Sequence, residues 1–393
     1  MMNDSILITG LGSISAAGTT VSESVLSFKN GNRICGPVTL FDTSLKYPVF
    51  EVRHIPSQFH REGLRTISLA LTAVDEALAQ SGLLGTVQEF RVGVCLGTTV
   101  ASQLNDLEFY RAYRTSGSAS LEPVDRYLKG NLAEYVAKNI GARGPRLTVV
   151  NACSSGTDAI GVALSWLRNG ICDIAIAGGA DELSRIPYCG FGSLGIMSVE
   201  LCSPFDRDRK GLNLGEGAGV VVLETRESAR KRGATADLFL AGFGASADAY
   251  HLTAPHPEGV GLVAAIRKAL AQAGIEPGDV AFVNAHGTAT PENDLAEGKA
   301  LANVFGNNVV MLSTKGYTGH TLGAAGGLEA VFAALGLRER WVPKCAGFRD
   351  KDPVIPIAPT DRETKIAGRY AVSTSLAFGG NNAAIVIGRG VDQ

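Results

Sequence analysis

The 393-residue sequence lacks the features that mark several classes of protein. No uninterrupted apolar run approaches the ~20 residues of a membrane span. Residues 1–10 lack the basic start and the long apolar run of a secretory signal. The net charge is only -2, so no strongly basic surface for nucleic acid is indicated. We therefore expect a globular protein with no membrane span and no nucleic-acid partner.

The cysteines form no recognisable framework. There are seven, an odd number, scattered from Cys35 to Cys345 without a Cys-x-x-Cys pair. Disulfide scaffolds typically contain an even number of cysteines, and cysteine-containing zinc sites typically show Cys-x-x-Cys pairs. We therefore expect no structural disulfide and no metal site, and we expect the reducing cytoplasm as the location.

Glycine, in contrast, is abundant, with 48 residues concentrated just after apolar runs. Glycine there lets the backbone turn tightly or approach another element closely. The first cluster, Gly10-Leu11-Gly12, resembles part of a dinucleotide-binding motif, but Ser15 stands at the third glycine position. No clear strand ending in an acidic residue follows about 20 positions later. The sequence therefore argues against nucleotide binding at this segment.

Short apolar segments alternate with helical patterns along the chain, which predicts an α/β fold with buried sheets covered by helices. Helical spacing is clearest over 63–80 and 322–337. The predicted strands cover 5–9, 92–96, 147–150, 173–177, 217–223, 280–283, 309–312, 371–375 and 383–387. No Pro/Ser-rich or highly charged linker divides the chain, so we expect one compact body.

One unit of this pattern occurs twice. A helix, a strand and a Gly-Thr turn in the first half are repeated in the second half. Ala77 corresponds to Ala269 with an offset of 192 residues, and Gly97 corresponds to Gly287 with an offset of 190. A repeat at about half the chain length predicts two similar halves.

Cys153 lies at a sharp turn between the strand predicted over 147–150 and a helix. The helical face carries Ile160, Ala163, Leu164 and Leu167. The N–H groups and dipole at a helix N-terminus favour a thiolate, and such placement lowers a cysteine pKa from about 8.5 to roughly 3.5–7.5. We therefore expect a nucleophile with a lowered pKa. A buried structural cysteine is the alternative that this segment alone leaves open.

Two of the six histidines lie in loops directly after predicted strands. These are His286 and His320, each flanked by glycine and threonine. Loops at the ends of buried strands commonly carry functional sites. Lys315 precedes His320 in an apolar, glycine-rich loop, where a lysine needs a partner such as Glu329.

These residues stand in long motifs: NACSSG (151–156), NAHGTATPEND (284–294), STKGYTGHTLGAAGG (313–327) and AFGGNN (377–382). Together they resemble the elongating, type II-like branch of the β-ketoacyl-ACP synthases, in the thiolase-like superfamily. The resemblance implies a duplicated, five-layered α-β-α-β-α fold. Its halves would be 1–240, carrying the nucleophile, and 241–393, carrying the histidines and the lysine.

The resemblance also implies a decarboxylative condensation that gives a 3-ketoacyl-ACP. Cys153 would hold the acyl group as a thioester, and its N–H with that of Phe378 would form an oxyanion hole. His286 and His320 would stabilise the malonyl-derived enolate, and Lys315 would pair with Glu329. The remaining implied roles are pantetheine binding by Thr288 and Thr290, and gating of the site by Phe378 and Asp248.

The implied partners are acyl carrier protein (ACP), with acyl and malonyl groups on its phosphopantetheine, and a second ketosynthase-like subunit. The latter would be the same chain or a chain-length factor. No metal or redox cofactor is expected. ACP is strongly acidic, so basic residues are candidates for its docking site: Arg61, Arg65, Arg207, Arg209 and Lys210.

The sequence departs from the family pattern at Ala377, where a glycine is usual, and over 210–214. We interpret both departures as signs of a specialised acyl or polyene substrate, or of a dedicated ACP. A thiolase would need a second catalytic cysteine, and Cys345 stands in no glycine-rich loop. A priming, type III-like synthase would have asparagine at His320. The remaining alternative is a non-condensing subunit that controls chain length, against which Cys153 argues.

Overall fold

The computed structural model describes residues 6–99, 101 and 104–390. Its main feature is a ten-stranded mixed sheet with the strand order β3-β2-β4-β5-β1-β6-β12-β11-β7-β8. The strands are β1 (Ile6–Ser15), β2 (Val92–Gly97), β3 (Arg146–Val149), β4 (Ile174–Asp181), β5 (Gly217–Thr225), β6 (Leu238–Ala247), β7 (Val280–Asn284), β8 (Met311–Leu312), β11 (Tyr370–Ala377) and β12 (Asn381–Arg389).

The strand order repeats, which confirms the predicted duplication. Strands β3-β2-β4-β5-β1 of the first half correspond in order to β8-β7-β11-β12-β6 of the second. The two halves meet where Ile6–Ile8 of β1 pairs with Leu238–Leu240 of β6. The boundary expected at 240/241 lies within β6, which spans Leu238–Ala247.

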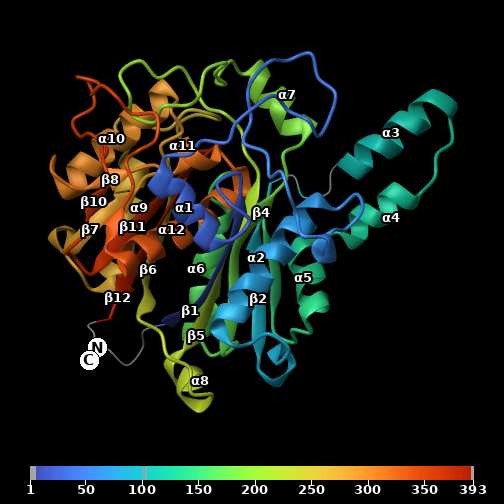
Figure 1. Cartoon of the computed structure of the whole chain (residues 1–393), viewed down its shortest axis with the longest axis horizontal. Coiled ribbons are helices and arrows are strands. Elements are labelled where there is room, and N and C mark those ends of the chain that lie inside the picture. Colours follow the sequence, from blue (N-terminus) through green and yellow to red (C-terminus); the bar gives the residue numbers. More distant parts are fainter. Residues whose placement is uncertain (1–5, 100, 102–103, 391–393) are drawn as a thin grey trace.

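Helices complete five layers, as the family resemblance implied (Figure 1). The outer layer on the first half holds α2 (Arg65–Ser81) and α5 (Leu132–Ile140), and the outer layer on the second holds α9 (Val260–Ala273) and α10 (Pro291–Phe305). Between the sheet halves lie α6 (Ser155–Arg168) and α12 (Ala325–Glu339). Helix α12 packs against β4 and β5 on one side and β11 and β12 on the other.

Glycines set the spacing of these layers. Strand β1 was expected to end at residue 9, but it continues to Ser15 through Gly10 and Gly12. A Cβ at Gly10 would lie 2.1 Å from the carbonyl oxygen of Ala77 in α2, and one at Gly12 would lie 1.9 Å from that of Ala73. These glycines therefore bring strand and helix into direct contact instead of forming a turn.

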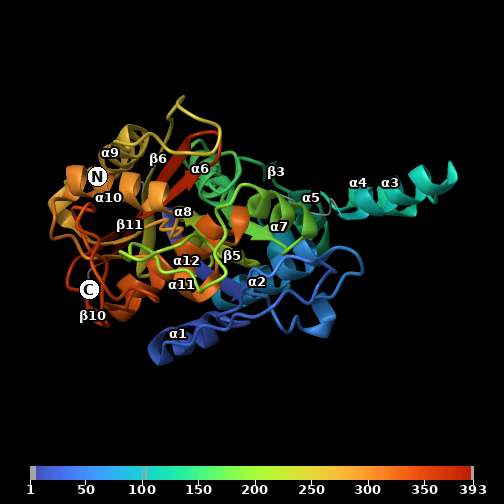
Figure 2. The ribbon, with the colours of Figure 1, turned by 90° about the horizontal axis from the view of Figure 1, so that it is seen from above.

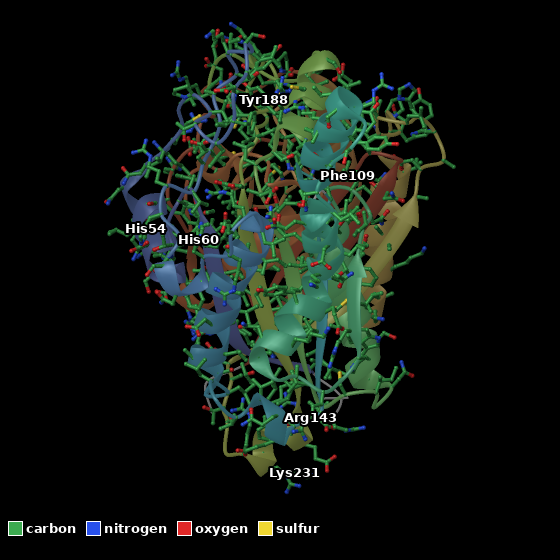
Figure 3. The ribbon with its side chains drawn as sticks, turned by 90° about the vertical axis from the view of Figure 1, so that its right-hand side faces the viewer. His54, His60, Phe109, Arg143, Tyr188 and Lys231 are labelled. Atoms are coloured by element: carbon green, nitrogen blue, oxygen red, sulfur yellow. The ribbon has the colours of Figure 1, made fainter. Side chains whose placement is uncertain are left out.

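Several elements were not predicted. Helices α3 (Leu104–Ser116) and α4 (Glu122–Lys129) form a hairpin that projects from the body (Figures 1 and 2). The hairpin faces the viewer in Figure 3, where Phe109 is labelled; the Phe109 and Tyr113 rings stack at 6.0 Å. Apart from this unpredicted hairpin, the remaining short elements of the structure are α1 (Val21–Asn30), α7 (Arg185–Ser193), α8 (Arg226–Lys231), α11 (Lys315–Thr318), β9 (Trp341–Val342) and β10 (Thr364–Lys365), of which the sequence itself indicates α1 and α8 as helical.

Within the described residues, none of the helices combines the length and the apolar character needed to cross a membrane.

Candidate active site

Cys153 lies in a strained turn between β3 and α6, as the sequence predicted. Ala152 adopts a left-handed conformation with φ 48°, which turns the chain sharply before the cysteine. Asp158 fixes this turn because its carboxylate accepts hydrogen bonds from Asn151 Nδ2 at 2.6 Å and Ser154 Oγ at 2.7 Å. Cys153 is therefore held just before the N-terminus of α6, where it is almost fully buried.

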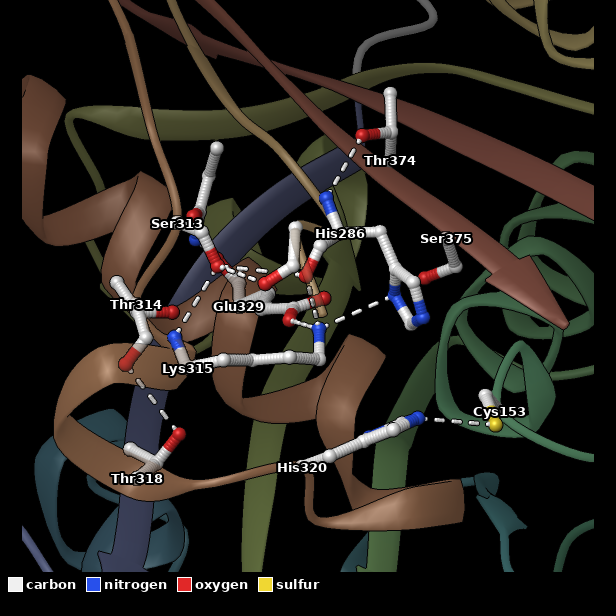
Figure 4. Close-up of polar contacts among 12 residues, drawn as sticks. Cys153, His286, Ser313, Thr314, Lys315, Thr318, His320, Glu329, Thr374 and Ser375 are labelled. Atoms are coloured by element: carbon white, nitrogen blue, oxygen red, sulfur yellow. Dashed lines mark hydrogen bonds and ion pairs between the residues drawn. The ribbon is translucent and has the colours of Figure 1, made fainter. Parts of the chain in front are cut away.

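His320 faces the cysteine. Its Nε2 lies 3.1 Å from Cys153 Sγ, and its Nδ1 accepts the backbone N–H of Leu322 at 3.3 Å (Figure 4). A neutral imidazole that accepts at Nδ1 carries its proton at Nε2. His320 is therefore set to donate a hydrogen bond toward the sulfur or toward an oxygen placed beside it.

Lys315 holds His286 in the same tautomer as His320, with the proton at Nε2. Its Nζ contacts His286 Nδ1 at 3.1 Å and donates to the His286 carbonyl oxygen at 2.6 Å. It also pairs with Glu329 Oε1, and both side chains of this ion pair are buried. Figure 4 shows His286 and His320 side by side, with ring centroids 5.1 Å apart. The two Nε2–H groups therefore converge near Cys153.

The charges of this centre follow from burial. Burial lowers the pKa of His286 and of His320 well below the usual value, and the nearby Lys315 charge lowers both further, so the rings are neutral. Burial raises the pKa of Glu329 to about 7, against the opposing effect of Lys315.

The expectation of a lowered cysteine pKa is wrong. Burial raises the pKa of Cys153 to about 12, although the Lys315 charge and the backbone N–H of Phe378 lower it. The sequence located the helix N-terminus correctly, but it did not reveal that the turn lies inside the protein. In the resting state the nucleophile is therefore a thiol.

A cavity of about 270 Å³ connects these groups. It is lined by every residue for which the sequence implied contact with substrate: Cys153, Asp248, His286, Thr288, Thr290, His320 and Phe378. Lys315 and Glu329 lie behind His286. The Thr288 and Thr290 hydroxyls are 3.0 Å apart on one wall, and the Phe378 backbone N–H donates to Cys153 Sγ.

The arrangement matches a known family. The model for "Beta-ketoacyl synthase, N-terminal domain" matches residues 3–229, and that for the C-terminal domain matches residues 239–349. The chain belongs to the β-ketoacyl synthase family.

Similar proteins agree with this assignment. The synthase is 34% identical to 3-oxoacyl-[acyl-carrier-protein] synthase 2 of Staphylococcus aureus (strain COL) over 98% of each chain. Among solved structures, it is similar to the ishigamide ketosynthase/chain length factor (31% identity, TM-score 0.92, covering 98% of this chain and 99% of that one). It is also similar to AntDE:AntF, a ketosynthase in complex with its type II acyl-carrier protein (27% identity, TM-score 0.90, 100% of each chain).

Phe378 lies in the short loop of the synthase between β11 and β12, where residue 377 does not need the conformation of a glycine. Ala377 is the last residue of β11 and pairs with Asn381 of β12, so it adopts ordinary strand geometry. The left-handed conformations fall on Gly379 (φ 85°) and Gly380 (φ 76°) instead. Conformational freedom is therefore provided at the tip of the loop, and Ala377 needs no special explanation there.

Two contacts hold this loop in place. The Phe378 ring stacks on Phe191 of α7, with centroids 5.2 Å apart and planes at 15°. Asp248 joins the loop through its backbone N–H, which donates to the Gly380 carbonyl at 2.7 Å. The Asp248 carboxylate accepts from Asn382 Nδ2 at 2.9 Å.

Sequence reasoning missed three residues that support the site. Glu297 of α10 is buried and accepts the backbone N–H groups of His286 at 2.8 Å and Gly287 at 2.7 Å. Arg33 donates to the Gly316 carbonyl at 2.7 Å and to the Cys202 carbonyl, which fixes the helix that begins with Lys315. Phe191 is the third. No local motif marks Arg33 and Phe191, because their contacts cross long sequence separations, and Glu297 lies just beyond the motif that ends at residue 294.

The five predicted docking residues differ in their placement. Arg65 and Arg209 form internal ion pairs, with Glu216 and Asp352, and the Arg209 side chain is only 5% exposed. The docking assignment of Arg209 is corrected accordingly, whereas the Arg65 side chain is 28% exposed and its docking role stays a prediction. Arg207 is exposed and pairs with Asp208 and Asp350, and Lys210 is exposed and pairs with Glu200. Arg61 donates to the carbonyls of Gln58 and His60.

Proposed function

We propose that this β-ketoacyl synthase joins an acyl group held on Cys153 to a malonyl group carried by ACP. One observation carries the proposal: a thiol and two imidazole Nε2–H groups, from segments far apart in the sequence, line one cavity. A thiol supplies a covalent acyl site, and two neutral donors supply a place for a developing oxyanion.

The first step is acyl transfer. Cys153 Sγ attacks the thioester carbonyl of acyl-ACP, and the backbone N–H groups of Cys153 and Phe378 hold the oxyanion. The pantetheine sulfur leaves and takes the proton lost by the Cys153 thiol, so the step needs no external base. His320 Nε2–H stabilises the charge on sulfur as that proton moves.

The second step makes the carbon–carbon bond. Malonyl-ACP loses CO2, and the electron pair of that bond forms an enolate whose oxygen accepts hydrogen bonds from His286 and His320. The enolate carbon attacks the Cys153 thioester, giving 3-ketoacyl-ACP and a Cys153 thiolate, which takes one proton from solvent water. Because decarboxylation supplies the carbanion, the chemistry needs neither metal nor redox cofactor.

The surrounding residues position these groups. Lys315, balanced by Glu329, holds the His286 tautomer. The Thr288 and Thr290 hydroxyls bind the pantetheine arm, and Phe378 with the Asp248 loop controls access to the cavity. The nucleophile must stay reduced, which suits the cytoplasm.

Intact-mass spectrometry after incubation with acyl-ACP tests the proposal, with the acyl chain varied in length and unsaturation. The wild type should gain one acyl mass and then release 3-ketoacyl-ACP on addition of malonyl-ACP. Cys153→Ala should lose both, whereas Cys189→Ala, which removes a half-buried thiol from α7, should retain both. A wild type that is never acylated would instead support a non-condensing subunit that controls chain length.

The synthase also has a surface for a second subunit of the same fold. Strand β3 is a terminal strand of the sheet, and Leu147 and Val150 beside it are exposed. Exposed edge strands and apolar patches mark association surfaces. The ishigamide ketosynthase/chain length factor is a precedent for such a pair. A second copy of this chain is the partner proposed here, and a chain-length factor is the alternative.

A further inference from the structure

The mouth of the catalytic cavity carries little positive charge. Among the described residues, those lining the cavity include two carboxylates, Asp248 and Glu292, and no lysine or arginine. Four of the five basic residues that were predicted to bind the carrier form ion pairs with carboxylates: Arg65, Arg207, Arg209 and Lys210. A strongly acidic partner would therefore find little net attraction from these residues.

Apolar side chains are exposed at the same place instead. Leu194 lines the cavity and is itself half exposed. The loop that supplies Asp248, Thr253 and the residues after it to the cavity wall also exposes Tyr250 (56%) and Leu252 (80%). We call Leu194, Tyr250 and Leu252 the apolar rim. Single exposed apolar side chains are common on protein surfaces, but several of them beside one opening mark an interaction surface.

We propose that the carrier protein docks on the apolar rim, through an apolar face around its prosthetic arm. This inference rests on the proposed function, because only a substrate tethered to a protein requires a docking surface at the mouth. A tethered thioester reaches Cys153 only when its carrier covers the opening. The surface beside the opening is therefore the docking surface, and here that surface is apolar.

The rim also touches the gate. The Leu252 carbonyl accepts the backbone N–H of Gly379 at 2.8 Å, one residue from Phe378. A carrier seated on Leu252 thus contacts the segment that is hydrogen-bonded to the gating loop. Docking and opening of the cavity are thereby linked through one short connection.

The test compares two acyl donors, acyl-ACP and the same acyl group on free pantetheine. The acyl chain is the one that the wild type uses best, and the acylation of Cys153 is measured with each donor. Tyr250→Asp and Leu252→Asp should raise KM for acyl-ACP about tenfold or more, because each puts a charge into an apolar contact. Acylation by acyl-pantetheine should change less than about twofold in either variant. Leu84→Asp, at an equally exposed (53%) leucine after α2, is the matched control and should leave both substrates unaffected.

The salt dependence of KM for acyl-ACP distinguishes apolar docking from electrostatic docking. Apolar docking predicts that the wild-type KM for acyl-ACP changes little between low and high salt, since screening weakens only charge pairs. The proposal is overturned if the rim variants keep the wild-type KM, or if Arg61→Glu raises KM in a strongly salt-dependent way while they do not. A wild type that neither thioester acylates would contradict the proposed function itself.

Discussion

At the scale of single residues, the chemistry depends on where two protons sit. Lys315 and the Leu322 N–H occupy the Nδ1 atoms of His286 and His320, so both rings present Nε2–H to the cavity. Protonation of either ring would place a second proton at Nδ1, facing a cation or an N–H donor. The lowered pKa of each histidine keeps the neutral form dominant at pH values below 6.5, and activity should persist there.

Lys315→Met tests this arrangement through the pH profile of malonyl-ACP decarboxylation. Removing the ammonium removes a charge that lowers both histidine pKa values, so the acid limb of the profile should move to higher pH. The maximal rate should fall about 10²-fold or more, since His286 loses the donor that sets its tautomer. Lys365→Met, at an exposed lysine in β10, should match the wild type. An unshifted acid limb would show that Lys315 does not set these pKa values.

The identities of the site residues could be predicted because they stand in contiguous motifs. Their electrostatics could not, because burial and pairing come from distant segments. Glu216 lies 151 residues from Arg65 in the sequence, and Asp352 lies 143 residues from Arg209. Because of these separations, the sequence does not indicate that either arginine is paired. The high pKa of Cys153 was missed for the same reason.

At the scale of elements, α12 is held by contacts between glycines. A Cβ at Gly327 would lie 2.3 Å from the Gly219 carbonyl oxygen in β5 and 2.7 Å from the Gly179 N in β4. Both atoms belong to backbone, so neither can rotate away. Because α12 follows directly on the loop with His320 and carries Glu329, this close approach also places two site residues.

Gly327→Ala should therefore destabilise the synthase by about 3 kcal/mol or more. Thermal unfolding, followed by circular dichroism, should show a clear drop in Tm or a failure to obtain folded protein. Gly278→Ala is the matched control, because open space surrounds Gly278 and its φ is not left-handed. If both variants have the same Tm as the wild type, the contact of Gly327 with β4 and β5 does not position α12.

The same contacts explain which elements the sequence predicted well. Helix α2 has the predicted helical spacing of apolar residues, and β2 is a short apolar run buried along its whole length, so both match the predicted segments. The strand predicted over 5–9 ends earlier than β1 because Gly10 and Gly12 resemble a turn in the sequence, although they pack against α2. The hairpin of α3 and α4 was missed because several of its apolar side chains face solvent, so no stripe points toward the core.

At the scale of the whole molecule, exposed apolar residues occur both beside the sheet edge and on the projecting hairpin. Leu147 beside the sheet edge is 43% exposed, and Leu128 on α4 is 70% exposed. The hairpin that carries Leu128 projects from the body on its own (Figure 2). Exposed apolar side chains on a projecting hairpin mark a surface for association with a partner.

We therefore expect the wild type alone to sediment as a dimer, with the sheet edge and the hairpin of one copy covered by the other. Leu147→Lys combined with Leu128→Lys should shift it to the monomer, because lysine blocks edge pairing and opposes apolar burial. Ile171→Lys changes an exposed isoleucine of the α6–β4 connection and should leave the dimer intact. A wild type that sediments as a monomer would contradict self-association. The same surface would then require a different chain of this fold, since its apolar area is independent of which partner covers it.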